Sequence, residues 1–135
     1  MKVYKCRVIV RGFAEGNPLI SNKPINLLTI DENGFINDFT SALKGLNVSN
    51  KVLIFPNAIG SSVGAYRFYA LKINNKAPKA IVCTKNTDII TASAAALADI
   101  PLVDKVENYK NMLDVINENK VVKVDAYKGL IQILG

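Results

Sequence analysis

Short apolar and alternating runs recur along the chain, and their lengths predict β-strands in its middle and at both ends. Residues 3–10 alternate and are rich in β-branched side chains, as exposed or half-buried strands are. Residues 51–55 and 80–83 are almost wholly apolar, which is typical of strands buried on both faces. The segments expected to be strands are 3–10, 19–21, 25–30, 51–55, 80–83, 100–103, 120–124 and 130–134.

Helical spacing appears between these runs. In residues 63–73, the apolar side chains expected to share one helical face are Val63, Tyr66, Ala70, Leu71 and Ile73. Residues 74–76 end that helix. A second helix is expected over the Ala-rich residues 89–98, capped by Thr87 or Asp88, and a third over residues 109–116.

Strands that alternate with helices predict a parallel sheet, and the strands at both ends predict a second, β-rich layer. We therefore expect an α/β fold in the form of a compact three-layer β/β/α domain spanning residues 1–135. The turn-rich residues 11–18 are expected to form a loop, and the weakly patterned residues 35–48 to lie on the surface.

The net charge of +6 excludes few classes of binding partner. Lysines are scattered, arginine occurs only at positions 7, 11 and 67, and no dense basic run interleaves with aromatic residues. Nucleic-acid binding is therefore not expected, whereas a small anionic substrate or an acidic partner subunit is. No apolar run approaches the ~20 residues of a membrane helix, and no signal peptide precedes the first strand, so we expect a cytoplasmic protein.

Cysteine and histidine usage restricts the chemistry further. Cys6 and Cys83 lie in apolar, strand-like contexts, and an iron–sulfur cluster ordinarily needs four cysteine thiolates. The chain has no histidine, which removes His-based nucleophile triads and most zinc sites. Transition-metal or iron–sulfur chemistry would have to come from another chain.

The segment from Phe55 to Gly64 carries the clearest chemical signal. A buried strand ends at Pro56, turns through Gly60, presents Ser61 and Ser62, and enters a helix. The N-terminus of a helix favours negative charge because backbone N–H groups point outward there. A serine at this place can bind an anion, can be helped toward an alkoxide, or can simply cap the helix.

Several short motifs, in order along the chain, resemble those of one family. They are Gly12 with Ala14-Glu15-Gly16 and Leu19-Ile20-Ser21, Pro24-Ile25, residues 51–56, Gly60-Ser61-Ser62-Val63-Gly64, residues 77–82, residues 100–104, and Val122-Lys123-Val124-Asp125 with Gly129. On these motifs the chain resembles the swivelling small subunits of aconitase X enzymes, in the archaeal branch that acts on phosphomevalonate.

The resemblance implies a fold, a partner and a reaction. The fold is the mobile β/β/α swivelling domain, and the partner is a large subunit that carries a [4Fe–4S] cluster. The reaction is the dehydration of (R)-5-phosphomevalonate to trans-anhydromevalonate 5-phosphate in the archaeal mevalonate pathway of isoprenoid synthesis. By match of the Gly-Ser-Ser motif, Ser62 is the proton acceptor, and the iron of the large subunit is the Lewis acid for the leaving hydroxyl.

Four neighbours of Ser62 are expected to bind substrate, namely Gly60, Ser61, Gly64 and Arg67. Each also has a simpler explanation, because the glycines suit a tight turn, Ser61 suits a helix cap, and Arg67 suits a solvated surface. The resemblance implies a basic residue at position 59, and Ile59 in its place removes a positive charge from this neighbourhood.

Two other functions stay open at this point. One is a hydroxyproline dehydratase of the aconitase X type, whose substrate has no phosphate. The other is a non-catalytic swivelling module that binds an anion at residues 60–62.

The dipole of the helix stabilises a negative charge at its N-terminus by up to ~2 kcal/mol. This lowers the pKa of Ser62 by about one unit or slightly more, which is too little to make it an alkoxide. Turn amides or a basic side chain of the partner must therefore add positive charge.

Overall fold

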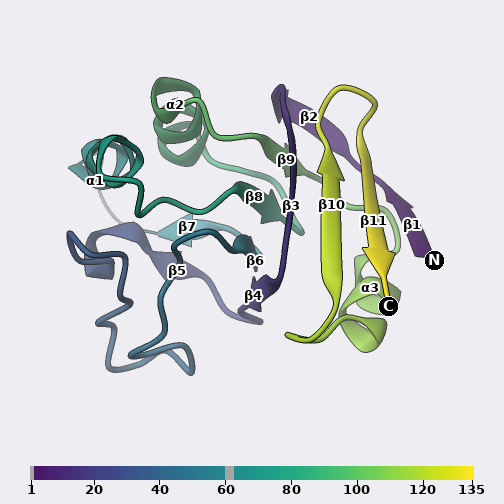
Figure 1. The fold of residues 1–135 in the computed structure, drawn as a ribbon, viewed down its shortest axis with the longest axis horizontal. Coiled ribbons are helices and arrows are strands. Elements are labelled where there is room, and N and C mark those ends of the chain that lie inside the picture. Colours follow the sequence, from purple (N-terminus) through teal and green to yellow (C-terminus); the bar gives the residue numbers. More distant parts are fainter. Residues whose placement is uncertain (1, 60–62) are drawn as a thin grey trace.

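The chain folds into three layers, with two β-sheets packed face to face and two helices on the outer face of the larger sheet (Figure 1). The computed structural model describes residues 2–59 and 63–135. This arrangement confirms the predicted three-layer β/β/α fold. Among the described residues, no helix is long and apolar enough to cross a membrane.

The middle layer is a mostly parallel sheet of five strands. Its order is β2 (Arg7–Val10), β9 (Leu102–Asp104), β8 (Ala80–Cys83), β6 (Val52–Phe55) and β4 (Pro18–Ile20). The four strands β9, β8, β6 and β4 run parallel, and β2 pairs antiparallel with β9 at one edge.

The two central strands are buried on both faces, which explains their unbroken apolar sequence. On β6, Leu53 and Phe55 join the core under the helices, while Val52 and Ile54 join the core between the two sheets. All four side chains are fully buried. The side chains of β8 alternate between the same two cores, as the two-residue period of a strand requires.

The second sheet is antiparallel, in the order β1 (Lys2–Lys5), β11 (Leu130–Leu134), β10 (Val121–Asp125) and β3 (Phe13–Gly16). The β10–β11 pair confirms the predicted closing hairpin. The expectation of a loop over residues 11–18 is wrong, because residues 13–16 pair with β10 and residues 18–20 form β4. The glycines at positions 12 and 16 are uncommon in strands, so the sequence pattern did not indicate the short strand between them.

The predicted strand over residues 3–10 is two strands in two different sheets. β1 ends before Cys6, and at this residue the chain crosses to the other sheet and begins β2. The backbone N–H of Cys6 donates to the Gly129 carbonyl at 2.9 Å. On β2, Arg7 binds the fully buried Asp104 of β9 through Nε at 2.8 Å and Nη2 at 2.7 Å. This paired hydrogen bond fixes the edge of the five-stranded sheet.

The three predicted helices are present as α1 (Val63–Ile73), α2 (Ile89–Ala98) and α3 (Tyr109–Val115). Asp88 caps α2 by accepting the Thr91 N–H at 3.1 Å and the Thr91 hydroxyl at 2.6 Å, as expected for the sequence. The predicted inner face of α1 is only partly right. Leu71 is fully buried together with Phe68, but Ala70 and Ile73 turn to solvent, as does Tyr66.

Residues 25–48 differ most from the expectation. Of the predicted strand 25–30, only Ile25–Asn26 (β5) is a strand, and a 3₁₀ turn follows at Leu27–Thr29. β5 pairs with Ala58–Ile59 (β7) in a small separate sheet. Residues 35–48 are not merely a surface segment, because Ile36 and Val48 are fully buried in the core under the helices. Their spacing matches neither a helix nor a strand, so the pattern did not reveal their burial.

The crossing from β1 to β2 makes a sharp prediction for Gly129. This residue has φ +74°, and a Cβ there would lie 2.6 Å from the Cys6 carbonyl oxygen. Left-handed backbone costs a non-glycine residue about 1–2 kcal/mol, and the contact adds to that cost. We expect Gly129→Ala to lower the free energy of unfolding by about 3 kcal/mol, measured by urea denaturation.

Gly45→Ala is the matched control, because Gly45 has φ +84° but no atom within 4 Å of its Cβ position. It should lose only the conformational term of about 1–2 kcal/mol. Equal losses in the two variants would show that the close approach to Cys6 is not a constraint.

Candidate functional site

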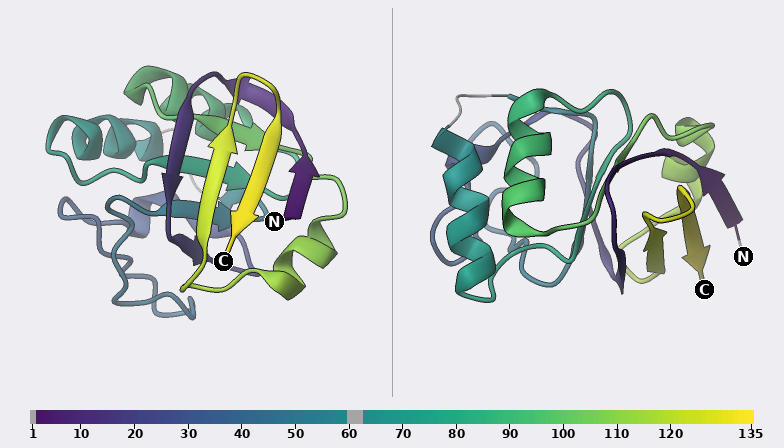
Figure 2. Two further views of the ribbon diagram at one scale, coloured as in Figure 1. Left: turned by 45° about the vertical axis from the view of Figure 1, so that its right-hand side comes forward. Right: turned by 90° about the horizontal axis from the view of Figure 1, so that it is seen from above.

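The candidate site lies where the parallel strands of the middle sheet end. In the parallel register, Ile20 of β4 faces Ile54 of β6, and Phe55 of β6 faces Cys83 of β8, so the three strands end at one edge. The chain leaves β6 toward α1 and leaves β8 toward α2, and the two helices lie side by side (Figure 2). In sheets of this kind, ligands bind outside the carboxyl ends of the strands.

In the sequence, the residues predicted to act on substrate follow soon after the end of β6. Gly60, Ser61 and Ser62 lie outside the described residues, and their roles stay predictions. Gly64 belongs to the first turn of α1. Arg67 follows on α1 and is half-buried.

The positive charge of Arg67 lowers the pKa of Asp31, a residue of the loop before Phe35. Burial by itself raises the pKa of Asp31, but hydrogen bonds from the Phe35 N–H at 3.0 Å and the Asn37 amide at 3.0 Å outweigh it. The Asn33 N–H and the positive charge of Arg67 lower the pKa of Asp31 further. Arg67 is therefore near a carboxylate, which leaves less of its charge for an anionic substrate.

A cavity of about 680 Å³ opens beside the end of β7. One wall is the loop that follows β4, with Ser21 and Lys23, and another is the loop with Asp38 and Ser41. Ile59, the residue before Gly60, also lines the cavity. Small-molecule sites in proteins commonly have this size and this mixture of apolar and polar lining.

Backbone hydrogen bonds hold the Lys23 loop against the end of β6. The Ser21 N–H donates to the Ile54 carbonyl at 2.8 Å, and the Ile25 N–H donates to the Asn57 carbonyl at 3.3 Å. Between these two ties, the Ser21 hydroxyl donates to the Lys23 carbonyl at 2.6 Å. The backbone that carries Lys23 is thus fixed beside the chain leading to Gly60.

The cavity holds one charge of each sign. Lys23 is exposed and forms no salt bridge within residues 2–59 and 63–135. The Thr40 hydroxyl at 2.6 Å and the Thr40 N–H at 2.9 Å both donate to Asp38 and lower the pKa of its carboxyl. Asp38 is therefore a carboxylate at neutral pH, and its charge is partly satisfied by Thr40, whereas the ammonium of Lys23 is available to a ligand.

Sequence reasoning did not single out Lys23 or Asp38. A signal for Lys23 was present, because it lies between the Leu19-Ile20-Ser21 and Pro24-Ile25 motifs. No such signal marked Asp38, since the segment around it has no regular hydrophobic period. Only the folded chain brings these two loops together.

The cysteines do not fit an iron–sulfur cluster. Burial, with a smaller effect of Asp104, raises the pKa of Cys83 to about 12, and burial likewise raises that of Cys6 to about 12. A cluster ordinarily takes four thiolate ligands, and this chain has two cysteines. Across residues 2–59 and 63–135, no group of three or more acidic, cysteine or histidine side chains is arranged to hold a metal ion.

Comparison with known proteins gives one consistent result. Residues 3–133 match the family described as "Aconitase X swivel domain". The chain is 42% identical, over 96% of its length and 95% of the relative's, to a "Phosphomevalonate dehydratase small subunit" of Thermococcus kodakarensis. It is 39% identical to the protein of the same name from Methanosarcina mazei, over 97% of this chain and 90% of that one.

The fold agrees with this result. The crystal structure of aconitase X from Thermococcus kodakaraensis, in its holo-form, contains a chain that superposes with a TM-score of 0.90 at 39% sequence identity. The superposition covers all of both chains. The likeness therefore extends over both sheets and the helical layer.

Proposed function

The chain belongs to the family of aconitase X swivel domains, and on that basis we propose that it is the small subunit of a phosphomevalonate dehydratase. In this role it would help convert (R)-5-phosphomevalonate to trans-anhydromevalonate 5-phosphate. The observation that carries the proposal is the 42% identity, over nearly the full length of both chains, to a relative of that name.

The cavity lined by Lys23 and Ile59 suits such a substrate. Phosphomevalonate is a small, flexible molecule with a carboxylate at one end and a phosphate at the other. Lys23 offers on one wall an ammonium that has no salt-bridge partner among the described residues, and Ile59 offers apolar contact. We propose that Lys23 binds one of the two anionic groups, because a charge-assisted hydrogen bond is roughly twice as strong as a neutral one.

Ser62 is the proposed proton acceptor, which takes the proton α to the substrate carboxylate. The helix N-terminus contributes too little to ionise a serine, so further positive charge has to reach it. Lys23 supplies part of that charge from the loop beside β6, in place of the basic residue that Ile59 replaces. The remainder is expected from the partner subunit.

We further propose that the [4Fe–4S] cluster is held by the large subunit. The chain has two cysteines, Cys6 between β1 and β2 and the buried Cys83 on β8, and two thiols are too few to hold a cluster. The relatives are named small subunits, which implies a large one. This chain then supplies the base and part of the substrate pocket, and the active site is complete only in the heterodimer.

A second candidate, a hydroxyproline dehydratase, is favoured by one observation. Asp38 is a carboxylate on the wall of the cavity. It could pair with the ammonium of an amino-acid substrate and would repel a phosphate. Assaying hydroxyproline beside 5-phosphomevalonate separates the two candidates.

The experiment that tests the proposed function is anaerobic reconstitution with the candidate large subunit, followed by an assay for loss of 5-phosphomevalonate. Removing a general acid–base group ordinarily costs 10²–10⁴-fold in rate. We therefore expect Ser62→Ala to lower kcat by about 10³-fold, with a smaller change in KM.

Each component alone should be inactive. Turnover by this chain without the large subunit would contradict the shared active site. Full turnover by Ser62→Ala would contradict the role of Ser62 and favour a non-catalytic, anion-binding module.

Lys23 makes a separate prediction about binding. Loss of one charged hydrogen bond costs about 1.5–3 kcal/mol, so Lys23→Ala should raise KM for 5-phosphomevalonate by about tenfold or more. Lys44→Ala is the control, since Lys44 lies over the Phe39 ring at 3.7 Å and does not line the cavity. Equal KM values for the two variants would exclude Lys23 from the substrate site.

A further inference from the structure

The solvent-facing sides of α1 and α2 are unusually apolar. On α1, Tyr66 is 69% exposed, Tyr69 43% and Ile73 62%, at spacings that place them along one stripe. On α2, Ile89 is 84% exposed and Leu97 55%. We refer to these five side chains together as the outer helix face.

The charged residues of the same two helices all have one sign. The segments Val63–Ile73 and Ile89–Ala98 contain two charged residues, Arg67 and Lys72, and both are positive. Lys72 lies at the far end of α1, where its Nζ donates to the Asp99 carbonyl at 3.2 Å. A surface that complements the two helices would be apolar at its centre and acidic at its edge.

This face is continuous with the candidate site. Tyr66 lies in the first turns of α1, and Ile89 is the first residue of α2. Because α1 and α2 follow parallel strands, both residues lie toward the edge of the sheet where the site is. Ile59, which lines the cavity, is itself 53% exposed.

From this continuity we propose that the large subunit docks on the outer helix face. The inference rests on the proposed function, in which the large subunit must approach residues 60–62 to complete the active site. A partner that reaches the chain between β7 and α1 also reaches the apolar stripe on α1 and the start of α2. Exposed aromatic and aliphatic side chains of this size are typical anchors of protein interfaces.

A second copy of this chain is a poorer occupant. The two helices would present positive charge to positive charge, since neither carries an acidic residue. A copy seated there would also lie beside residues 60–62 and compete with the large subunit that the active site needs. The large subunit meets the requirement of position, because the proposed active site needs it at this end of α1 and α2.

The test places a charge at the centre of the proposed contact. In Tyr66→Lys and Ile89→Lys the new side chain lies in solvent when the chain is free, so folding should be unaffected. Binding to the large subunit would then bury an unpaired charge. We expect each variant to raise the Kd for the large subunit by about tenfold or more, measured by isothermal titration calorimetry.

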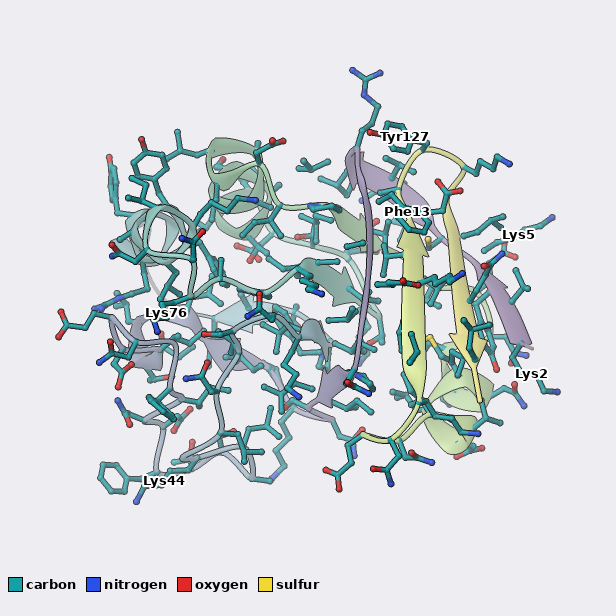
Figure 3. All side chains as sticks on the ribbon, viewed as in Figure 1. Lys2, Lys5, Phe13, Lys44, Lys76 and Tyr127 are labelled. Atoms are coloured by element: carbon teal, nitrogen blue, oxygen red, sulfur yellow. The ribbon has the colours of Figure 1, made fainter. Side chains whose placement is uncertain are left out.

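Tyr127→Lys is the matched control. Tyr127 is 67% exposed, nearly the same as Tyr66, but it lies in the turn between β10 and β11. Figure 3 shows Tyr127 and Phe13 beside the four-stranded sheet, on the side of the molecule away from α1. The control should change Kd less than twofold.

Three outcomes would overturn the proposal. One is unchanged binding by both helix variants, and another is weakened binding by Tyr127→Lys alone. The third is self-association of the free chain that Tyr66→Lys abolishes while the Kd for the large subunit stays the same. A complex that forms and responds to the helix variants, yet does not dehydrate 5-phosphomevalonate, would instead refute the proposed function and leave the docking surface standing.

Discussion

The parallel pairing of β4, β6 and β8 is the constraint on which the rest of the structure depends. Because β6 and β8 are buried on both faces, their side chains hold the second sheet on one side and the helices on the other. Because the strands run parallel, each must end at the same edge before the chain returns to start the next strand. Folding of the core thus decides where the chemistry can occur.

The position of the candidate site follows from this geometry. The loop after β4 carries Lys23, and the chain after β6 carries Ile59 and then residues 60–62. Hydrogen bonds from Ser21 and Ile25 bind the first of these segments to the second. The arrangement places Lys23 on the same cavity as Ile59, which comes three positions before the proposed base in the sequence. It also leaves a carboxylate, Asp38, on the same cavity, which sets a limit on the anions that the cavity accepts.

Sequence reasoning succeeded where one physical signal dominated. Unbroken apolar runs identified β6 and β8, and the Asp88 cap with its Ala-rich run identified α2. The sequence-based prediction of secondary structure was wrong where tertiary contacts override the local hydrophobic pattern. Residues 13–16 form a strand only because β10 offers a partner, and the break at Cys6 depends on the Gly129 turn, far away in the sequence. Likewise, α1 turns Tyr66 and Ile73 outward because Phe68 and Leu71 fill the core. An apolar helix position that the pattern assigns to the interior can instead be part of an interface.

The central claim is that the chain works through the edge formed by the ends of β4, β6 and β8, and that the large subunit covers this edge. Hydrogen–deuterium exchange of the chain, free and in complex with the large subunit, tests it most directly. The account predicts slower exchange in residues 19–26, 63–73 and 89–98 on complex formation, and no change in residues 121–134. Slower exchange confined to the β10–β11 hairpin, with no change near Lys23 or α1, would contradict it.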